Sequence, residues 1–167
     1  MIKFKDKIVP DAYHGTSKAN AQNIIRIGKF ELSSGKECYL GDGIYFFEAG
    51  KGHAEWWARR KYGSGTRIAV IIATVQLGKC LDLGNPEHIR LIELARQEIQ
   101  KQSLDIELSD TLVINFLAKK VSTDIETVRG YFHGSPERVF TGSKVFEITH
   151  VVICVKNHGN ILTFALL

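Results

Sequence analysis

The sequence predicts an α+β fold built on a mostly antiparallel β-sheet, and three observations point to it. Two long runs rich in β-branched residues lie far apart in the chain, at 66–77 and 145–156. Between them, residues 86 to about 132 show the apolar spacing of helices, which predicts a helical insertion. Short strands and helices fill the first half without the regular alternation that a parallel sheet requires.

The length and composition are those of one globular domain over residues 1–167. Of the 167 residues, 44% are hydrophobic, which is enough to bury a core without disulfides or a metal. The formal net charge of +4 suits an anionic ligand or nucleic acid and proves neither.

The cysteines and the N-terminus indicate a cytoplasmic protein. Cys38, Cys80 and Cys154 are odd in number and widely spaced, which argues against a disulfide framework and fits a reducing compartment. No cysteine or histidine pair has zinc-ligand spacing, so no metal site is expected. The N-terminus has no apolar signal-peptide core, and no run approaches the roughly 20 residues that cross a membrane.

The chain is expected to begin with a weak strand over 1–10 that Pro10 ends. Residues 12–14 then finish a second short strand, and Gly15 turns the chain. Thr16 or Ser17 can cap a helix that follows.

That first helix is predicted over 18–27, with isoleucines on one side and Gly28 as the left-handed cap. The glycine-rich turn 41–43 then delivers an apolar strand, 44–47. A second glycine-rich turn, at 50–52, opens a helix to about residue 62.

The second half is dominated by the run 66–77, a strand predicted to be central and buried on both faces. Pro86 suits the first position of a helix, Ser109 and Asp110 cap another, and Ser122 or Thr123 can start a third. The runs 145–156 and 161–167, joined by a turn, are predicted to pair as a hairpin.

Two motifs in the first half resemble a known family. Tyr13-His14-Gly15-Thr16 precedes the first helix, and Gly41-Asp42-Gly43-Ile44-Tyr45-Phe46 precedes a helix that bears tryptophans. Together they are similar to the NAD-binding half of the ADP-ribosyltransferase superfamily, on the side of the poly(ADP-ribose) polymerases and diphtheria toxin. The resemblance is clear over 12–60, weaker after 66, and absent over 86–132. It implies the split antiparallel sheet of that family.

The resemblance also implies roles for residues that match the motifs. His14 would hydrogen-bond the adenine-side ribose, with Gly15 and Thr16 beside it at the nicotinamide amide. Tyr45 would stack on the nicotinamide ring. The plain alternative is a half-buried histidine and an ordinary core tyrosine.

The helix after the second motif carries two further implied contacts. Counting along without gaps, Trp56 falls where the family places a second aromatic ring that sandwiches nicotinamide. His53 falls where a small hydroxyl residue contacts the amide.

The third family motif, a glutamate at the start of a late strand, has no direct counterpart. Strand-on-strand alignment puts His150 at that position, and Glu147 is the nearby carboxylate. A glutamate could orient the ribose 2′-hydroxyl and activate an acceptor, whereas a histidine would differ in charge at neutral pH. The two residues lie on opposite faces of a regular strand, and both are kept as candidates.

The function implied is that of a mono-ADP-ribosyltransferase, a transferase of the glycosyltransferase class that uses NAD as co-substrate. The acceptor would be a macromolecule, protein or nucleic acid, and a toxin or effector with an antitoxin or inhibitor protein as partner fits the compact chain. The loop 134–144 offers Arg138, Phe140 and Lys144 for acceptor recognition, or is simply solvated. The alternatives are a non-catalytic module that binds NAD or ADP-ribose, and a nucleic-acid-binding protein.

Overall fold

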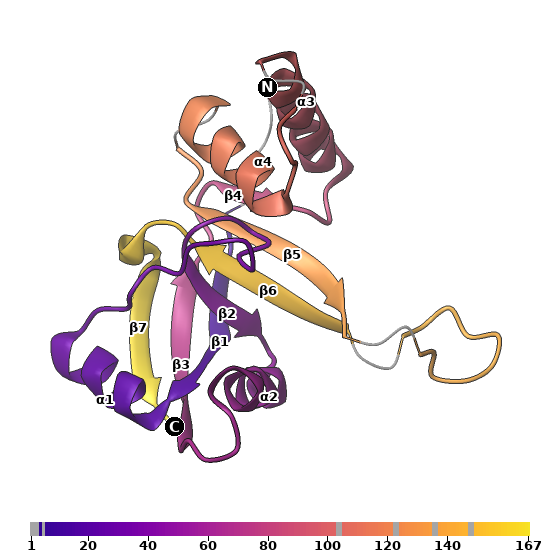
Figure 1. Ribbon diagram of the computed structural model, residues 1–167. Coiled ribbons are helices and arrows are strands. Elements are labelled where there is room, and N and C mark those ends of the chain that lie inside the picture. The colour runs from indigo at the N-terminus through magenta and orange to yellow at the C-terminus, as the bar shows by residue number, and fades with distance from the viewer. Residues whose placement is uncertain (1–3, 5, 103–104, 122–123, 135–136, 147–148) are drawn as a thin grey trace.

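The computed structural model describes residues 4, 6–102, 105–121, 124–134, 137–146 and 149–167, and over these it has the predicted α+β class. Seven strands form one mixed sheet, accompanied by four α-helices (Figure 1). The elements are β1 (Ile8–Ser17), α1 (Lys18–Ile27), β2 (Ile44–Glu48), α2 (Lys51–Tyr62), β3 (Ile68–Gln76), β4 (Cys80–Asp82), α3 (Pro86–Gln102), α4 (Asp110–Phe116), the π-helical turn η1 (Leu117–Val121), β5 (Thr127–His133), β6 (Thr149–Val155), the 3-10 turn η2 (His158–Asn160) and β7 (Ile161–Leu166).

The sheet has the strand order β4-β5-β6-β2-β1-β3-β7. The short pair β4 and β5 is parallel, and each of the other neighbouring pairs is antiparallel. In Figure 1, α1 and α2 lie at one end of the molecule, and α3 and α4 lie together at the end where β4 lies.

The sheet divides between β1 and β2. These two strands pair only at Ala12 with Glu48 and at Tyr13 with Phe47, whereas β1 pairs with β3 along its whole length. From His14 onward, the edge of β1 that faces β2 therefore has no strand partner among the described residues. Figure 1 shows the result: β5, β6 and β2 cross the direction of β3 and β7 at an angle.

Two apolar clusters lie on the two faces of this divided sheet. The first contains Ile24 of α1 with Phe30 and Phe46, and the second contains residues of α3 and α4 with Leu40. Strand β6 contributes alternate residues to each cluster, because successive side chains of a strand point to opposite faces.

Several predicted helix boundaries are confirmed. The Ser17 side chain caps α1 by accepting from the Asn20 N–H at 3.2 Å, and Gly28 ends the helix with a left-handed φ of 74°. Pro86 opens α3, and the Ser109 side chain caps α4.

The prediction that Pro10 ends one strand and Gly15 turns the chain is wrong. Strand β1 runs through both residues, with a register shift between Val9 and Ala12 that accommodates the proline. Gly15 lies inside the strand, where a Cβ atom would come 1.9 Å from the Ala54 carbonyl oxygen of α2. The glycine is therefore needed for close packing of a helix and not for a turn.

The helical insertion is also shorter than predicted. Helical structure ends at η1, and residues 127–133 form β5, a strand between β4 and β6. Thr127 and Val128 are fully buried there, and tertiary pairing satisfies the backbone that a helix would otherwise satisfy.

The predicted C-terminal hairpin is wrong, because β7 pairs with β3 and not with β6. Four strand spacings separate β6 from β7, about 19 Å in a flat sheet. The connection from Val155 to Ile161 covers six Cα–Cα steps, about 20 Å if fully extended, but the 3-10 turn η2 makes half of it much shorter. The angle between the two parts of the sheet therefore has to bring the end of β6 near the start of β7.

No described helix has both the length and the apolarity needed to cross a membrane.

Candidate functional site

His14 lies where β1 and β2 separate. Its Nδ1 is 2.8 Å from the Tyr45 carbonyl oxygen, and its ring packs edge-on against Phe30 and close to Phe46. Burial lowers the pKa of His14, the bond to the Tyr45 backbone opposes this, and Lys61 lowers the pKa further. The imidazole is therefore neutral at neutral pH. Because a carbonyl oxygen can only accept, Nδ1 carries the proton and Nε2 is left as an acceptor.

A cavity of about 650 Å³ opens beside this ring, and we call it the His14 pocket. Its volume is within the range of small-molecule and cofactor sites. Its polar wall is formed by His14, Thr16, Asn20, Asn23, Lys29, Glu31, Ser33, Lys61 and Tyr62, and its apolar wall by Ile24, Ile27, Phe30 and Leu32.

The Tyr62 hydroxyl connects the two sides of the pocket. It lies 3.2 Å from the Thr16 hydroxyl and accepts from the Asn20 side-chain amide at 3.2 Å. Burial raises the pKa of Tyr62, but the bonds with Thr16 and Asn20 outweigh burial and the net pKa is lowered. The end of α2 is thus fixed to the start of α1, and both present polar groups to one hollow.

Tyr45 is the residue that the resemblance places against the nicotinamide ring, but its side chain has other partners in the fold. Its hydroxyl donates to the Gly41 carbonyl oxygen at 2.6 Å and accepts from the Leu40 N–H at 3.0 Å. Its ring packs on the second apolar cluster, whereas Phe46 belongs to the first. Tyr45 thus contacts His14 through its backbone, and its ring does not line the His14 pocket.

Trp56 is 54% exposed on the outer side of α2, with the Arg60 guanidinium 5.6 Å from the centre of its ring. Within the described part of the chain, Trp56 and Tyr45 form no ring contact.

Two other predicted site residues, His53 and His150, lie close together. Their ring centres are 5.2 Å apart, and Phe47 lies 6.0 Å from His53 and 5.5 Å from His150. Phe132 stacks on His150 at 6.0 Å. We call these four rings the histidine–aromatic cluster. It combines α2, β2, β5 and β6, so only the fold assembles it.

His150 is neutral at neutral pH. Burial lowers its pKa, with smaller contributions in the same direction from His53 and His133. Its Nδ1 is buried and has no hydrogen-bond partner among the described residues. Glu147, the alternative third-motif residue, lies outside the described residues.

Residues 137–144 of the predicted recognition loop project from the body of the molecule between β5 and β6 (Figure 1). Arg138 pairs across it with Phe146, and its guanidinium lies 4.7 Å from the centre of the Phe146 ring. Phe140 is 67% exposed and Lys144 is exposed.

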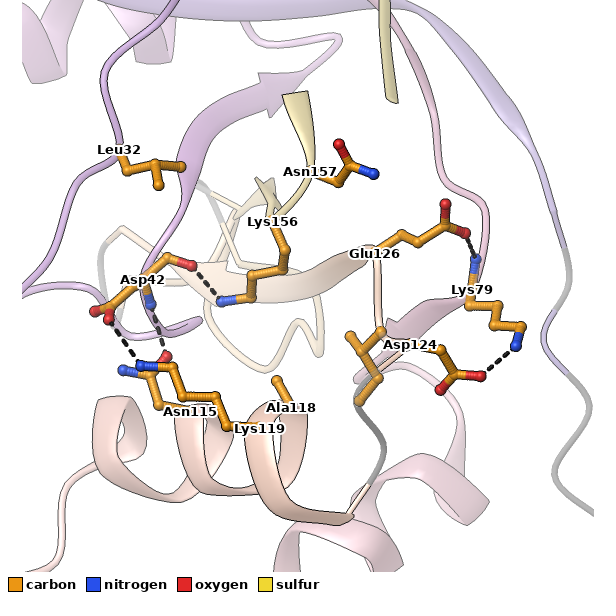
Figure 2. A pocket seen from close by; sticks show the side chains of 11 residues that line it. Leu32, Asp42, Lys79, Asn115, Ala118, Lys119, Asp124, Glu126, Lys156 and Asn157 are labelled. Atoms are coloured by element: carbon orange, nitrogen blue, oxygen red, sulfur yellow. Dashed lines mark hydrogen bonds and ion pairs between the residues drawn. The ribbon is translucent and has the colours of Figure 1, made fainter. Parts of the chain in front are cut away.

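A second cavity, of about 700 Å³, lies between the turn 41–43 and helix α4, and we call it the Lys156 pocket (Figure 2). The Lys156 ammonium donates to the Leu40 and Asp42 carbonyl oxygens, at 2.7 Å each. Burial lowers the pKa of Lys156. The Asp42 N–H donates to Asn115 Oδ1 at 2.9 Å, and the Asp42 carboxylate lies 3.7 Å from the Lys119 ammonium.

The opposite side of this cavity is also paired internally. Lys79 forms an ion pair with Asp124, and its backbone N–H donates to the Glu126 carboxylate at 2.7 Å. Figure 2 shows these pairs facing each other across the hollow. Leu32 lines both cavities, which makes them neighbours.

Sequence reasoning missed Asn20, Lys61, Tyr62 and Phe47. Asn20 lies on the exposed side of α1, and that side is a wall of the pocket. Tyr62 follows Ala54 and Ala58 at helical spacing, and this signal could have placed it on the face of α2 that packs against β1.

Within the part of the chain that the structure describes, no three His, Cys, Asp or Glu side chains are grouped as metal ligands would be.

Comparison with known proteins adds one distant relative. The chain is 28% identical to an uncharacterized protein of Methanocaldococcus jannaschii over a 174-residue alignment, which covers 87% of this chain and 81% of that protein. No protein-family model matches the chain, and no solved structure matches it. The relative carries no functional description that could be considered for this chain.

Proposed function

We propose that this protein is an NAD-dependent mono-ADP-ribosyltransferase that breaks the nicotinamide–ribose bond and transfers ADP-ribose to a protein or nucleic acid. One observation carries the proposal. The imidazole of His14 is fixed by a backbone carbonyl at the point where two strands separate, and it borders a cavity with several hydroxyl and amide groups. The resemblance of the two sequence motifs to the ADP-ribosyltransferases agrees with this arrangement.

The His14 pocket is proposed to hold the adenosine and diphosphate part of NAD. The acceptor Nε2 of neutral His14 suits a ribose hydroxyl, which can donate to it. Thr16 and Asn20 offer further partners for ribose and base. Lys61 and Lys29 supply positive charge for the diphosphate.

The nicotinamide end is proposed to lie toward the histidine–aromatic cluster, near Gly15, Tyr45 and Trp56. His53 and Tyr62 are nine residues apart on α2, about 13 Å along its axis. Nine residues are about two and a half helical turns, so these two side chains point to opposite sides of α2, and a ligand lying along one side of the helix reaches only one of them. The nicotinamide ring would therefore face His53, with Phe47 behind it, on the side of α2 away from Tyr62.

The reaction balances without an added oxidant or metal. The bond between ribose C1′ and the pyridinium nitrogen breaks, and its electron pair leaves with neutral nicotinamide. A nucleophile of the acceptor forms the new bond to C1′ and loses its proton. Nearby polar groups stabilise the positive charge that develops on the ribose. Either His150, which is neutral, or the carboxylate of Glu147 could take the acceptor's proton.

The test is release of nicotinamide from NAD together with transfer of labelled ADP-ribose to lysate protein, RNA or DNA. We expect His14→Ala to abolish both signals. His150→Ala and Glu147→Gln, made separately, should identify the third-motif residue, because the inactive one of the two carries that role. Lys101→Ala, at the exposed end of α3, is the control for general effects. Absence of nicotinamide release by the unmodified protein with every acceptor would overturn the proposed transfer.

A second candidate function is binding of NAD or ADP-ribose without transfer. One observation favours it: the third-motif position holds His150, which is uncharged at neutral pH and packed among aromatic rings. Binding of NAD in calorimetry with no nicotinamide release would select this candidate over the transferase.

A further inference from the structure

Helix α4 of the insertion holds a long connecting segment, residues 35–42, by its backbone. The buried Thr111 hydroxyl lies 3.0 Å from the Cys38 carbonyl oxygen and 3.3 Å from that of Gly35. One turn further along, Asn115 Oδ1 accepts from the Asp42 N–H at 2.9 Å. The Gly35 and Cys38 carbonyl oxygens also accept from the Cys38 and Gly41 N–H groups, so the Thr111 hydroxyl adds a second donor to a turn that the segment forms by itself. The Asp42 N–H, outside any strand, has the Asn115 side chain as its partner.

The same segment is joined directly to the wall of the His14 pocket. Ser33 and Gly43 exchange two backbone hydrogen bonds, at 2.8 and 2.9 Å, so they close the loop that contains residues 35–42. Ser33, together with Glu31 and Leu32, lines the His14 pocket. The path from Asn115 to the pocket thus runs through Asp42, Gly43 and Ser33, each in contact with the next.

Gly41 allows the backbone of 35–42 to lie close to Asn115 of α4. Its φ is 77°, and a Cβ atom there would lie 2.6 Å from Asn115 Oδ1 and 2.7 Å from the Lys156 ammonium. The backbone therefore approaches α4 more closely than any other residue type would allow.

We propose that Thr111 and Asn115 are positioning residues: through 35–42 they fix the part of the His14 pocket wall formed by residues 31–33. The insertion would then be part of the ligand site's framework, although neither side chain touches the pocket. The choice of NAD as the ligand rests on the proposed function. The hold of Thr111 and Asn115 on residues 35–42 does not depend on it.

The link also has to act in reverse. If holding 35–42 favours ligand binding, then ligand binding must favour the held state by the same factor, because the two equilibria share one free-energy cycle. NAD should therefore slow amide exchange in 35–43 of the unmodified protein.

The experiment compares amide hydrogen exchange and NAD affinity in Thr111→Val, which removes the hydroxyl at nearly constant shape, and in Asn115→Ala. We expect exchange at Ser33 and across 35–43 to accelerate about tenfold, with exchange in β3 unchanged. We expect NAD affinity to fall about fivefold to tenfold. Thr111→Ser keeps the hydroxyl and should restore both readouts, and Thr163→Val, on the exposed strand β7, should change neither.

Three results would overturn the proposal. Unchanged exchange at 35–43 in both variants would show that α4 does not hold the segment. Equal acceleration in β3 would show general destabilisation. Faster exchange at 35–43 with unchanged NAD affinity would break the link to the pocket. If the unmodified protein does not bind NAD, the proposed function fails, and exchange at Ser33 alone decides whether α4 holds the wall.

Discussion

The two cavities that share Leu32 differ in where their polar groups find partners. In the Lys156 pocket, ammonium, carboxylate and amide groups bind one another or nearby backbone, as with Lys156 on two carbonyl oxygens and Lys79 on Asp124. In the His14 pocket, internal bonds fix the side chains of His14, Thr16, Asn20 and Tyr62. His14 uses Nδ1 on the Tyr45 carbonyl and keeps Nε2 as an acceptor.

This difference separates a structural cavity from a ligand site of nearly equal size. Charges that neutralise each other in a cavity hold two parts of the fold together and gain little from a ligand. Groups held in position with an unused donor or acceptor are prepared for a ligand at little entropic cost. We therefore expect mutations in the Lys156 pocket, apart from Asn115 with its link to 35–42, to change mainly stability, and mutations in the His14 pocket to change mainly binding.

The largest expected effect comes from the glycines beside the two pockets. Gly15→Ala places a Cβ against backbone of α2, so it should lower the free energy of unfolding by about 3 kcal/mol and abolish NAD binding. In Gly41→Ala, the added Cβ meets the flexible ends of the Asn115 and Lys156 side chains, and the residue keeps a left-handed φ. The free energy of unfolding should fall by about 1–2 kcal/mol. Urea unfolding measures both. Gly52→Ala, with open space around it, is the control, and a cost of Gly15→Ala no greater than its cost would contradict the packing described.

The next contrast is between two lysines. Lys156→Met leaves the Leu40 and Asp42 carbonyl oxygens without their buried donor, and should lower the free energy of unfolding by about 1–3 kcal/mol. Lys61→Met, at an exposed side chain, should leave stability unchanged and weaken NAD binding up to about tenfold. Thermal unfolding and calorimetric titration measure the two quantities. The distinction between the pockets fails if Lys61→Met is the more destabilising of the two.

A smaller effect is expected from one hydroxyl. Tyr62→Phe removes the partner of Thr16 and Asn20 but keeps the ring, so NAD affinity should fall about fivefold with a loss of stability near 1 kcal/mol. Tyr39→Phe, at a tyrosine that is 51% exposed and outside the His14 pocket, is the matched control. Equal affinities for the two variants would remove Tyr62 from the site.

The smallest effect is a dependence on pH. Because burial lowers the pKa of His14, the native state resists protonation, and protonation would convert Nε2 from acceptor to donor. NAD affinity should be flat above the ordinary histidine pKa of about 6.5 and fall below the His14 pKa, by at most about tenfold per pH unit.

The contribution of His14 to the free energy of unfolding also decreases as pH falls. The unfolded state takes up the proton first, so stability is lost as pH falls from the unfolded pKa toward the lowered folded value. Calorimetric titration across pH 5–8 measures the affinity. In His14→Asn the pH dependence of affinity should disappear, and its persistence would assign the titration to another group.

Local signals predicted the elements with strong intrinsic preference. The cap residues Ser17 and Gly28 bounded α1 correctly, and Pro86 marked the start of α3. The apolar run in the middle of the chain became β3, which is central in its half of the sheet. Such features depend on a few neighbouring residues, and the sequence contains all of them.

Features that depend on distant partners were predicted less well. Residues 127–133 have a spacing compatible with a helix, but β4 and β6 supply hydrogen-bond partners that make them a strand. The final two strands have a turn between them, yet the angle of the divided sheet sends β7 to the other edge. Pairing energy between remote segments decides such cases, and no local pattern contains it.

The sequence alone determined the α+β class, the helix caps and the two motifs that contain His14 and Tyr45. Only the tertiary structure decided that α2 packs closely against Gly15 and that the Tyr45 ring lies away from the His14 pocket. It brought His53 and His150 together. It also made α4 the support of 35–42. The physical reason is that a cap or turn is stabilised by bonds within a few residues, whereas a pocket is formed by side chains from several elements whose positions depend on how the whole sheet bends.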